Sequence, residues 1–190
     1  PSPRGGLQLL NIALPRYDAK KDKWQDVELD FGKRVPAFID WLAARLTLPV
    51  DLPLRCTFST QTPDAWAAGL ELADAAFRDG DLSRTELEQR LARLVTWWRS
   101  ADRHPLRYFP RTSWAAWQAV QESDLDVASV VRKTWASSDY KTGERDFAPG
   151  YAAMLAGDDV FAIGSPALGE LQEFARDLAA TLHVGFGAGQ

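Results

Sequence analysis

From Gly32 onward, apolar residues recur at helical spacing through most of the chain, and proline or glycine separates the segments. A repeat near 3.6 residues indicates amphipathic helices, each of which buries one face against another element. Thr62-Pro63, Ser83 and Ser165-Pro166 have the composition of helix starts, and Gly80 that of a helix end. We therefore expect helices at 32–46, 63–79, 84–103, 125–135 and 166–182, and a short one capped by Thr112 or Ser113.

The front of the chain has a different pattern, which indicates strands. Residues 7–14 are mostly apolar, residues 24–31 alternate between polar and apolar, and residues 54–60 follow two prolines. The polar run 16–23 suits the tip of a hairpin. Together these segments predict an α/β (α+β) fold with a small mixed sheet and a helix-rich second half. No internal repeat or low-complexity linker divides the 190 residues, so we expect residues 1–190 to form a single domain.

Composition excludes several classes of protein. The chain is 46% hydrophobic and 25% charged, as is usual for a globular domain. Cys56 stands alone, which fits a reducing cytoplasm, and His104 and His183 are too far apart for the usual zinc sites, so we expect no metal. No run of apolar residues is long enough to span a membrane, and no signal peptide is visible. Because the sequence starts without methionine, we expect a fragment of a longer cytoplasmic protein.

The charge is unevenly distributed. Residues 1–34 carry seven Lys/Arg and five Asp/Glu, which leaves 15 and 21 for the rest of a chain with net charge −4. Phosphate binding needs clustered cations, so any contact with nucleic acid is expected at the hairpin tip. The candidate DNA-binding residues are Arg16, Tyr17, Lys20, Lys21 and Lys23, with a base stacked on the tyrosine ring. The alternative is that this tip is simply a solvated turn.

One segment has the composition of an active site: Asp139-Tyr140-Lys141-Thr142-Gly143. On a strand, an acid and a lysine two residues apart share a face, where Asp139 and a second acid, Asp126, would bind Mg²⁺ while Lys141 stabilises developing charge. This resembles the last motif strand of RecB-type nucleases in the PD-(D/E)XK superfamily. However, the segment follows Ala136-Ser137-Ser138 rather than apolar residues, and Asp126 opens a segment of helical spacing.

The same region fits a longer pattern better. Its motifs, in order, are Pro105-Leu106-x-x-Phe109-Pro110-x-x-Ser113-Trp114, a helix ending in Trp135, Gly143-Glu144-x-Asp146 and Tyr151. In this order and spacing the chain resembles the C-terminal region of the exodeoxyribonuclease V gamma subunit family, RecC, over about residues 82–184 and more loosely over 32–46. The resemblance implies a nuclease-like, PD-(D/E)XK-like core without catalytic residues, used for assembly and DNA handling, with a strand-separating pin near the hairpin.

Three hypotheses follow. The leading one is a non-catalytic domain of a helicase–nuclease complex in recombinational double-strand break repair, whose partners are the other exodeoxyribonuclease V subunits and DNA at the fork, and which needs no cofactor. The second is an active Mg²⁺-dependent nuclease that uses Asp126, Asp139 and Lys141. The third is a protein-interaction domain unrelated to DNA. Under the leading hypothesis, Glu144 and Asp146 are structural and accept hydrogen bonds from backbone donors at the start of the following helix.

Overall fold

The computed structural model describes residues 5–15, 17–18, 22–24, 27–59, 65–103, 106–122, 126–147, 149–155 and 160–182. The chain divides into two compact units, one made of residues 1–95 with 182–190 and the other of residues 96–181. Whether the two units behave as one domain, as the sequence predicts, stays a prediction.

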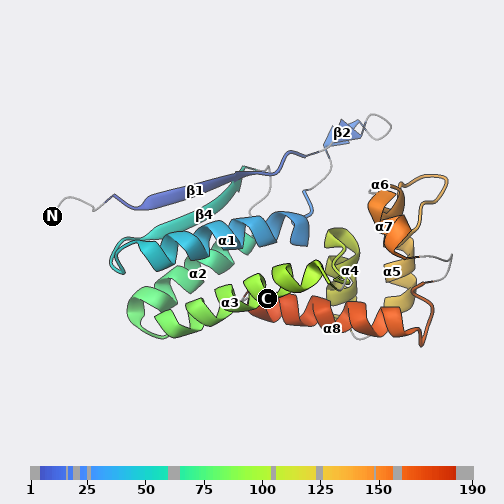
Figure 1. Cartoon of the computed structure of the whole chain (residues 1–190). Helices are drawn as coiled ribbons and strands as arrows, with labels where there is room; N and C mark the ends of the chain where they lie inside the picture. Colours follow the sequence, from blue (N-terminus) through green and yellow to red (C-terminus); the bar gives the residue numbers. More distant parts are fainter. Residues whose placement is uncertain are drawn as a thin grey trace. The chain divides into compact units, whose positions relative to one another are not determined.

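All the strands of the described residues lie in the first 59 residues, and the elements that follow β4 are helices (Figure 1). The elements are β1 (Leu7–Ile12), β2 (Tyr17–Asp18), β3 (Lys23–Trp24), α1 (Phe31–Thr47), β4 (Leu54–Ser59), α2 (Ala65–Asp79), α3 (Arg84–Ala101), α4 (Pro110–Gln121), α5 (Val127–Trp135), α6 (Glu144–Phe147), α7 (Pro149–Met154) and α8 (Pro166–Thr181). The mixed α/β class with a helix-rich second half is confirmed, whereas a PD-(D/E)XK-like core stays a prediction. No helix in the described part of the chain is long and apolar enough to cross a bilayer.

The first unit is built on a strand–helix–strand arrangement. β1 and β4 pair in parallel, with Leu7 opposite Leu54 and Ile12 opposite Ser59, and α1 makes the crossover between them. Alternate residues of β4 are buried, as the burial pattern of a strand with one covered face requires. α1 and α2 cover that face, and β1 lies on the far side of β4 from α2 (Figure 1).

The expected strand at 24–31 is only partly formed. β3 ends at Trp24, residues 27–30 have no strand partner, and Phe31 already begins α1. The alternation of polar and apolar residues nevertheless predicts burial correctly, because Leu29 and Phe31 are both in the core. Alternating polarity shows that one side of an extended segment is covered, but it does not require that a second strand pairs with it.

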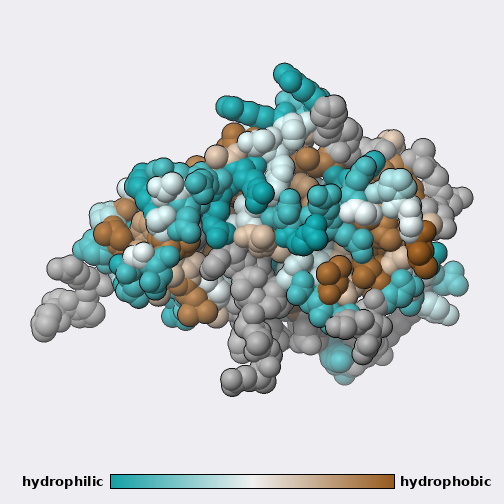
Figure 2. All heavy atoms as spheres, turned by 90° about the horizontal axis from the view of Figure 1, so that it is seen from below, coloured by the Kyte–Doolittle hydropathy of each residue, from teal (hydrophilic) through white to brown (hydrophobic). Residues whose placement is uncertain are grey.

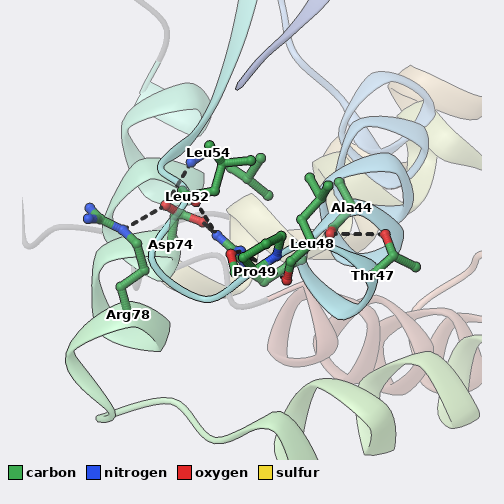
Figure 3. Close-up of polar contacts among 9 residues, drawn as sticks. Ala44, Thr47, Leu48, Pro49, Leu52, Leu54, Asp74 and Arg78 are labelled. Carbon is green, nitrogen blue, oxygen red and sulfur yellow. Dashed lines mark hydrogen bonds and ion pairs between the residues drawn. The ribbon is translucent and has the colours of Figure 1, made fainter. Parts of the chain in front are cut away.

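A buried ion pair joins α1 to α2. Arg45 Nη1 lies 2.9 Å from Asp74 Oδ1, and both side chains are almost fully buried. The other carboxylate oxygen of Asp74 accepts a hydrogen bond from the backbone N–H of Leu54 at 2.9 Å and from Arg78 Nε at 3.2 Å (Figure 3). This one carboxylate therefore connects two helices to the first residue of β4.

The same arginine closes the end of α1. The last carbonyl groups of a helix have no partner within the helix, and Arg45 reaches forward to the turn that follows. Its guanidinium donates to the carbonyl of Leu52 at 2.7 Å and to that of Pro49. The turn between α1 and β4 is consequently held by side-chain donors as well as by its own backbone.

Local signals at the ends of α2 and α3 act as the sequence predicts. Gly80 follows α2 with a φ of 90°, a left-handed conformation that glycine adopts without steric cost. Ser83 and Glu86 form the expected capping box: the Ser83 N–H donates to Glu86 Oε2 at 2.7 Å, and the Glu86 N–H donates to Ser83 Oγ at 3.2 Å.

In α3, the helical spacing of apolar residues corresponds to burial only in the first turns. Leu87 is buried, but Trp98, about three turns further along the same side of the helix, is 73% exposed. Its neighbour Trp97 packs instead against Phe174 of α8, with ring centroids 5.1 Å apart. Within the second unit, the last turns of α3 therefore pack through a face about 100° around from Trp98.

Aromatic residues centre the core of the second unit. Phe109 lies 4.8 Å from Trp135 and 5.0 Å from Tyr151 between ring centroids, with the edge-on geometry that aromatic pairs prefer. The buried residues of this cluster come from the segment before α4 and from α4, α5, α8 and the loops beside them: Phe109, Ala116, Ala128, Val131, Trp135, Leu155, Phe161, Leu168 and Leu171. The proline-aromatic turn and the tryptophan singled out in the sequence are thus core residues.

The buried ion pair makes a testable prediction about stability. Asp74→Ala should lower the free energy of unfolding by about 3–5 kcal/mol, because it leaves a buried guanidinium without its carboxylate. Denaturant unfolding followed by circular dichroism measures the change. Glu71→Ala is the matched control: it removes an exposed ion pair with Arg55, which should cost less than about 1 kcal/mol. Equal losses for the two variants would contradict the assigned role of Asp74.

Candidate functional site

The predicted DNA-binding hairpin exists as a two-residue antiparallel pair. Tyr17 is opposite Trp24, and Asp18 is opposite Lys23. Asp22 has a φ of 49°, a left-handed conformation that aspartate tolerates better than most residues. Its carboxylate accepts a hydrogen bond from the Tyr17 hydroxyl. That hydrogen bond, with a smaller effect of burial, raises the pKa of Tyr17 above its ordinary value.

The hairpin presents part of the predicted site to solvent. Tyr17 is 45% exposed, and Lys23 is exposed as well. Arg16, Lys20 and Lys21 lie outside the described residues. An exposed ring can stack on a base, and an ammonium group can meet a phosphate. The register, however, places Tyr17 and Lys23 on opposite faces of the two-residue pair. DNA binding by this hairpin stays a prediction.

The three residues of the nuclease hypothesis lie at different ends of α5. Asp126 is the N-cap of that helix, and its carboxylate accepts a hydrogen bond from the Ala128 N–H at 3.1 Å. The nine residues of α5 correspond to a rise of roughly 13 Å along the helix axis. Asp139 and Lys141 follow the other end. Asp126 therefore has the capping role expected for an acid at a helix start.

Asp139 and Lys141 belong to a tight turn rather than to a strand. Ser138 and Lys141 form an isolated bridge, with hydrogen bonds of 2.8 and 3.3 Å between their backbone groups. Asp139 and Tyr140 are the two central residues of this turn, and all four side chains are exposed. The shared strand face that the catalytic hypothesis needs is not formed. Among the residues that the structure describes, no group of three or more His, Cys, Asp or Glu is arranged to hold a metal ion.

The acid that sequence reasoning placed least accurately is Glu144. Its side chain is only 4% exposed, and it reaches across to the first turn of α4. There, Oε1 accepts a hydrogen bond from the Arg111 N–H at 3.0 Å and Oε2 accepts one from the Thr112 N–H at 2.7 Å. The prediction that Glu144 accepts hydrogen bonds from backbone donors at a helix start is confirmed. The helix is α4, however, and not the helix that comes after Glu144 in the sequence.

The start of α4 explains why a distant carboxylate is needed. The helix begins at Pro110, and its N-cap residue, Phe109, has no side chain that accepts a hydrogen bond. The prediction that Thr112 or Ser113 caps this helix is wrong, because the helix already begins at Pro110, and proline suits the first helical position. The N–H groups of the first turn would thus be buried without partners. Glu144 supplies the two acceptors, and its negative charge lies at the positive end of the helix dipole.

Gly143 allows this arrangement. A Cβ atom built on Gly143 would lie 2.3 Å from the carbonyl oxygen of Trp135, closer than any real contact. Only glycine lets the loop pass this near to the end of α5, and that approach points Glu144 toward α4. The Gly143 N–H also donates to Ser137 Oγ at 2.8 Å. The sequence signal for the site was therefore the Gly-Glu pair, although its partner could not be identified.

Asp146 has a different role from the one predicted. Its carboxylate accepts a hydrogen bond from the Ser137 hydroxyl at 2.5 Å and not from a helix-start N–H. This bond, followed by the nearby Arg145, lowers the pKa of Asp146 below its ordinary value. A carboxyl with a lowered pKa stabilises the fold at neutral pH, and this contribution is lost as the pH falls through that pKa. Ser137 thus bridges Gly143 and Asp146 and closes the loop.

The comparisons with known proteins indicate the same family as the resemblance in the sequence, but they match a different range of residues. A family model described as the RecC C-terminal domain matches residues 9–121. The matched segment includes the hairpin, the Arg45–Asp74 ion pair and all of α4, whereas Asp126, Asp139 and Glu144 follow its end. No curated protein and no solved structure matches the chain.

The cap on α4 makes the second prediction. Glu144→Ala should lower the free energy of unfolding by about 1–3 kcal/mol, because it leaves a buried N–H without an acceptor. Glu144→Gln, which keeps one acceptor oxygen, should lose less. The control is Glu170→Ala, which removes an exposed pair with Arg107 and should cost less than about 1 kcal/mol. A Glu144→Ala variant as stable as the control would contradict the capping role.

The third prediction concerns cleavage. The protein should not cut linear single- or double-stranded DNA in the presence of Mg²⁺ or Mn²⁺, because Asp126 and Asp139 are at opposite ends of α5. Products on a denaturing gel provide the measurement. Nuclease activity that Lys141→Ala abolishes and Lys133→Ala, an equally exposed lysine of α5, leaves intact would instead support the catalytic hypothesis.

Proposed function

Since the chain belongs to the RecC C-terminal domain family, we propose that it is a non-catalytic domain of the exodeoxyribonuclease V gamma subunit that supports duplex splitting and subunit docking. The family implies membership of a multi-subunit complex, RecBCD, and a place in DNA repair. Under this proposal the domain meets DNA at the fork and acts in recombinational repair of double-strand breaks. It works in the cytoplasm and needs no cofactor of its own.

The observation that carries the DNA half of the proposal is the hairpin. The described part of the hairpin is held by the β2–β3 pair and by the Tyr17–Asp22 hydrogen bond. Its sequence holds the densest group of cations in an otherwise acidic chain. A wedge that separates strands needs an aromatic surface for an unpaired base and positive charge for the backbone beside it. The hairpin tip combines both within eight residues, 16–23.

The placement of the acids supports the non-catalytic half. Asp126, Glu144 and Asp146 each accept a hydrogen bond from the protein itself, and Asp139 lies in an exposed turn. Carboxylates that are used in this way stabilise the fold and are not gathered around a common point. The Mg²⁺-dependent nuclease is therefore the weaker proposal, since no contact among the described residues favours it.

Exposed apolar side chains support the docking half. Figure 2 shows a face that is mostly hydrophilic, on which hydrophobic residues gather in separate patches. Trp98 is a large exposed aromatic on a rigid helix, the type of side chain that most often anchors a protein interface. Trp97 and Trp117 are half-buried and buried respectively, so Trp98 is the tryptophan that we propose as the anchor.

The fourth prediction separates DNA handling from assembly in the intact complex. Reversing Arg16, Lys20, Lys21 and Lys23 to Glu should slow duplex unwinding and make the unwinding rate less dependent on salt while leaving the subunits associated, because each lost phosphate contact releases fewer counterions. Trp98→Ala should instead weaken the association of the subunits, while the cations of the hairpin remain in place. Unwinding rate and retention on a size-exclusion column are measured for each purified complex.

The matched control reverses four cations outside the hairpin, Arg99, Arg103, Lys133 and Lys141, and so makes the same change in net charge. This variant should unwind DNA at a rate close to that of the unmodified complex. If the hairpin variant also assembles and unwinds normally, the segment 16–23 is a solvated turn and its proposed role in DNA handling is wrong.

A further inference from the structure

The outer face of the β1–β4 sheet is apolar on β1 and uncovered by any described residue. Leu10 and Ile12 of β1 are 64% and 70% exposed, and Leu14, two residues beyond, is 78% exposed. These three side chains share a face because strand residues alternate. Their neighbours on β4 across the register are Thr57 and Ser59, which are polar but uncharged. Parallel sheets are normally buried on both faces, whereas the described residues pack only against the inner face of this one.

The free edge of β1 is also open. The N–H groups of Leu7 and Ala13 donate to the Pro53 and Ser59 carbonyls at 3.0 and 3.3 Å, so the odd-numbered residues point their backbone groups at β4. By alternation, the N–H and C=O groups of the even-numbered residues 8–12 point away from it. Within the described fold, β4 is the strand that pairs with β1, and no strand lies on the other side (Figure 1).

This edge lacks the features that keep strands from pairing with other chains. Natural edge strands carry charged residues, bulges or an internal proline. The segment 5–14, Gly-Gly-Leu-Gln-Leu-Leu-Asn-Ile-Ala-Leu, contains no charge and no proline, and its register with β4 is unbroken from Leu7 to Ile12. An uncharged edge beside an exposed apolar face aggregates unless another segment covers it. The assembled protein must therefore supply that cover.

We propose that β1 accepts an uncharged, extended segment of a partner subunit as a third strand. The open donors and acceptors recur every second residue, which a strand matches and a helix does not. Leu10, Ile12 and Leu14 provide the apolar contacts for alternate side chains of that segment. The charged residue on this face, Arg55, is already paired with Glu71 at 2.7 Å, so a neutral occupant fits it better than an acidic or basic one. This inference rests on the family and its multi-subunit complex, and not on the role of the hairpin.

Site-specific photocrosslinking in the intact complex identifies the occupant. Ile12→p-benzoylphenylalanine should give one adduct with another subunit, mapped by mass spectrometry to a segment without charged residues. Leu72, an equally exposed apolar residue on α2, provides the background when replaced in the same way. The proposal is overturned by an adduct with a second copy of this chain, with the same polypeptide or with DNA, and by labelling no stronger than at Leu72.

Hydrogen exchange in the same complex tests the strand pairing with an internal control. The amides of residues 9, 11 and 13 are protected by β4 in any case, so strand addition should slow residues 8, 10 and 12 to within about tenfold of them. An alternating pattern, in which the even-numbered amides exchange freely while the odd-numbered ones are protected, would show that no strand is added. Neither experiment depends on DNA, so a failure here leaves the hairpin proposal standing.

Discussion

The cost of burying an unpaired polar group determines how each unit of this structure is held together. In the first unit, Asp74 accepts from the Arg45 guanidinium and the Leu54 N–H, and in the second unit Glu144 accepts from two N–H groups of α4. Each carboxylate is almost fully buried and joins elements that are distant in the sequence. Removing either would leave a buried donor or charge without a partner, which is far more costly than losing a surface contact.

This use of acids also bears on function. The chain has more acidic than basic residues, and the segment that most resembles an active site lies among them. In the structure, Asp126 and Glu144 accept hydrogen bonds from backbone groups at helix starts, and Asp146 accepts one from the Ser137 hydroxyl that closes its loop. The proposed function rests instead on three surface features: the hairpin, the exposed Trp98 on α3 and the open edge of β1. The family implies membership of a multi-subunit complex.

The edge of β1 and the short β2–β3 hairpin are both exposed because few strands are paired in the described part of the first unit. The alternating segment after β3 turns into α1 instead of pairing, and β1 is left with one described neighbour. A two-stranded parallel sheet is too small to cover its own faces. Its stability comes from α1 and α2 on one side, and the other side is where the structure leaves room for a partner.

What the sequence determined by itself are the features whose physical partners lie within a few residues. Gly80, the Ser83–Glu86 box, the Asp126 cap and the start of α8 at Pro166 are all predictable, since the backbone groups they satisfy lie within the same turn. Only the tertiary structure decided that Glu144 binds donors 32 and 33 residues away and that Arg45 pairs with Asp74, 29 residues on. It also decided that Trp98 is exposed while Trp97 packs on Phe174. Periodicity tells which side of an element is apolar, but what covers that side depends on elements that the local pattern does not specify.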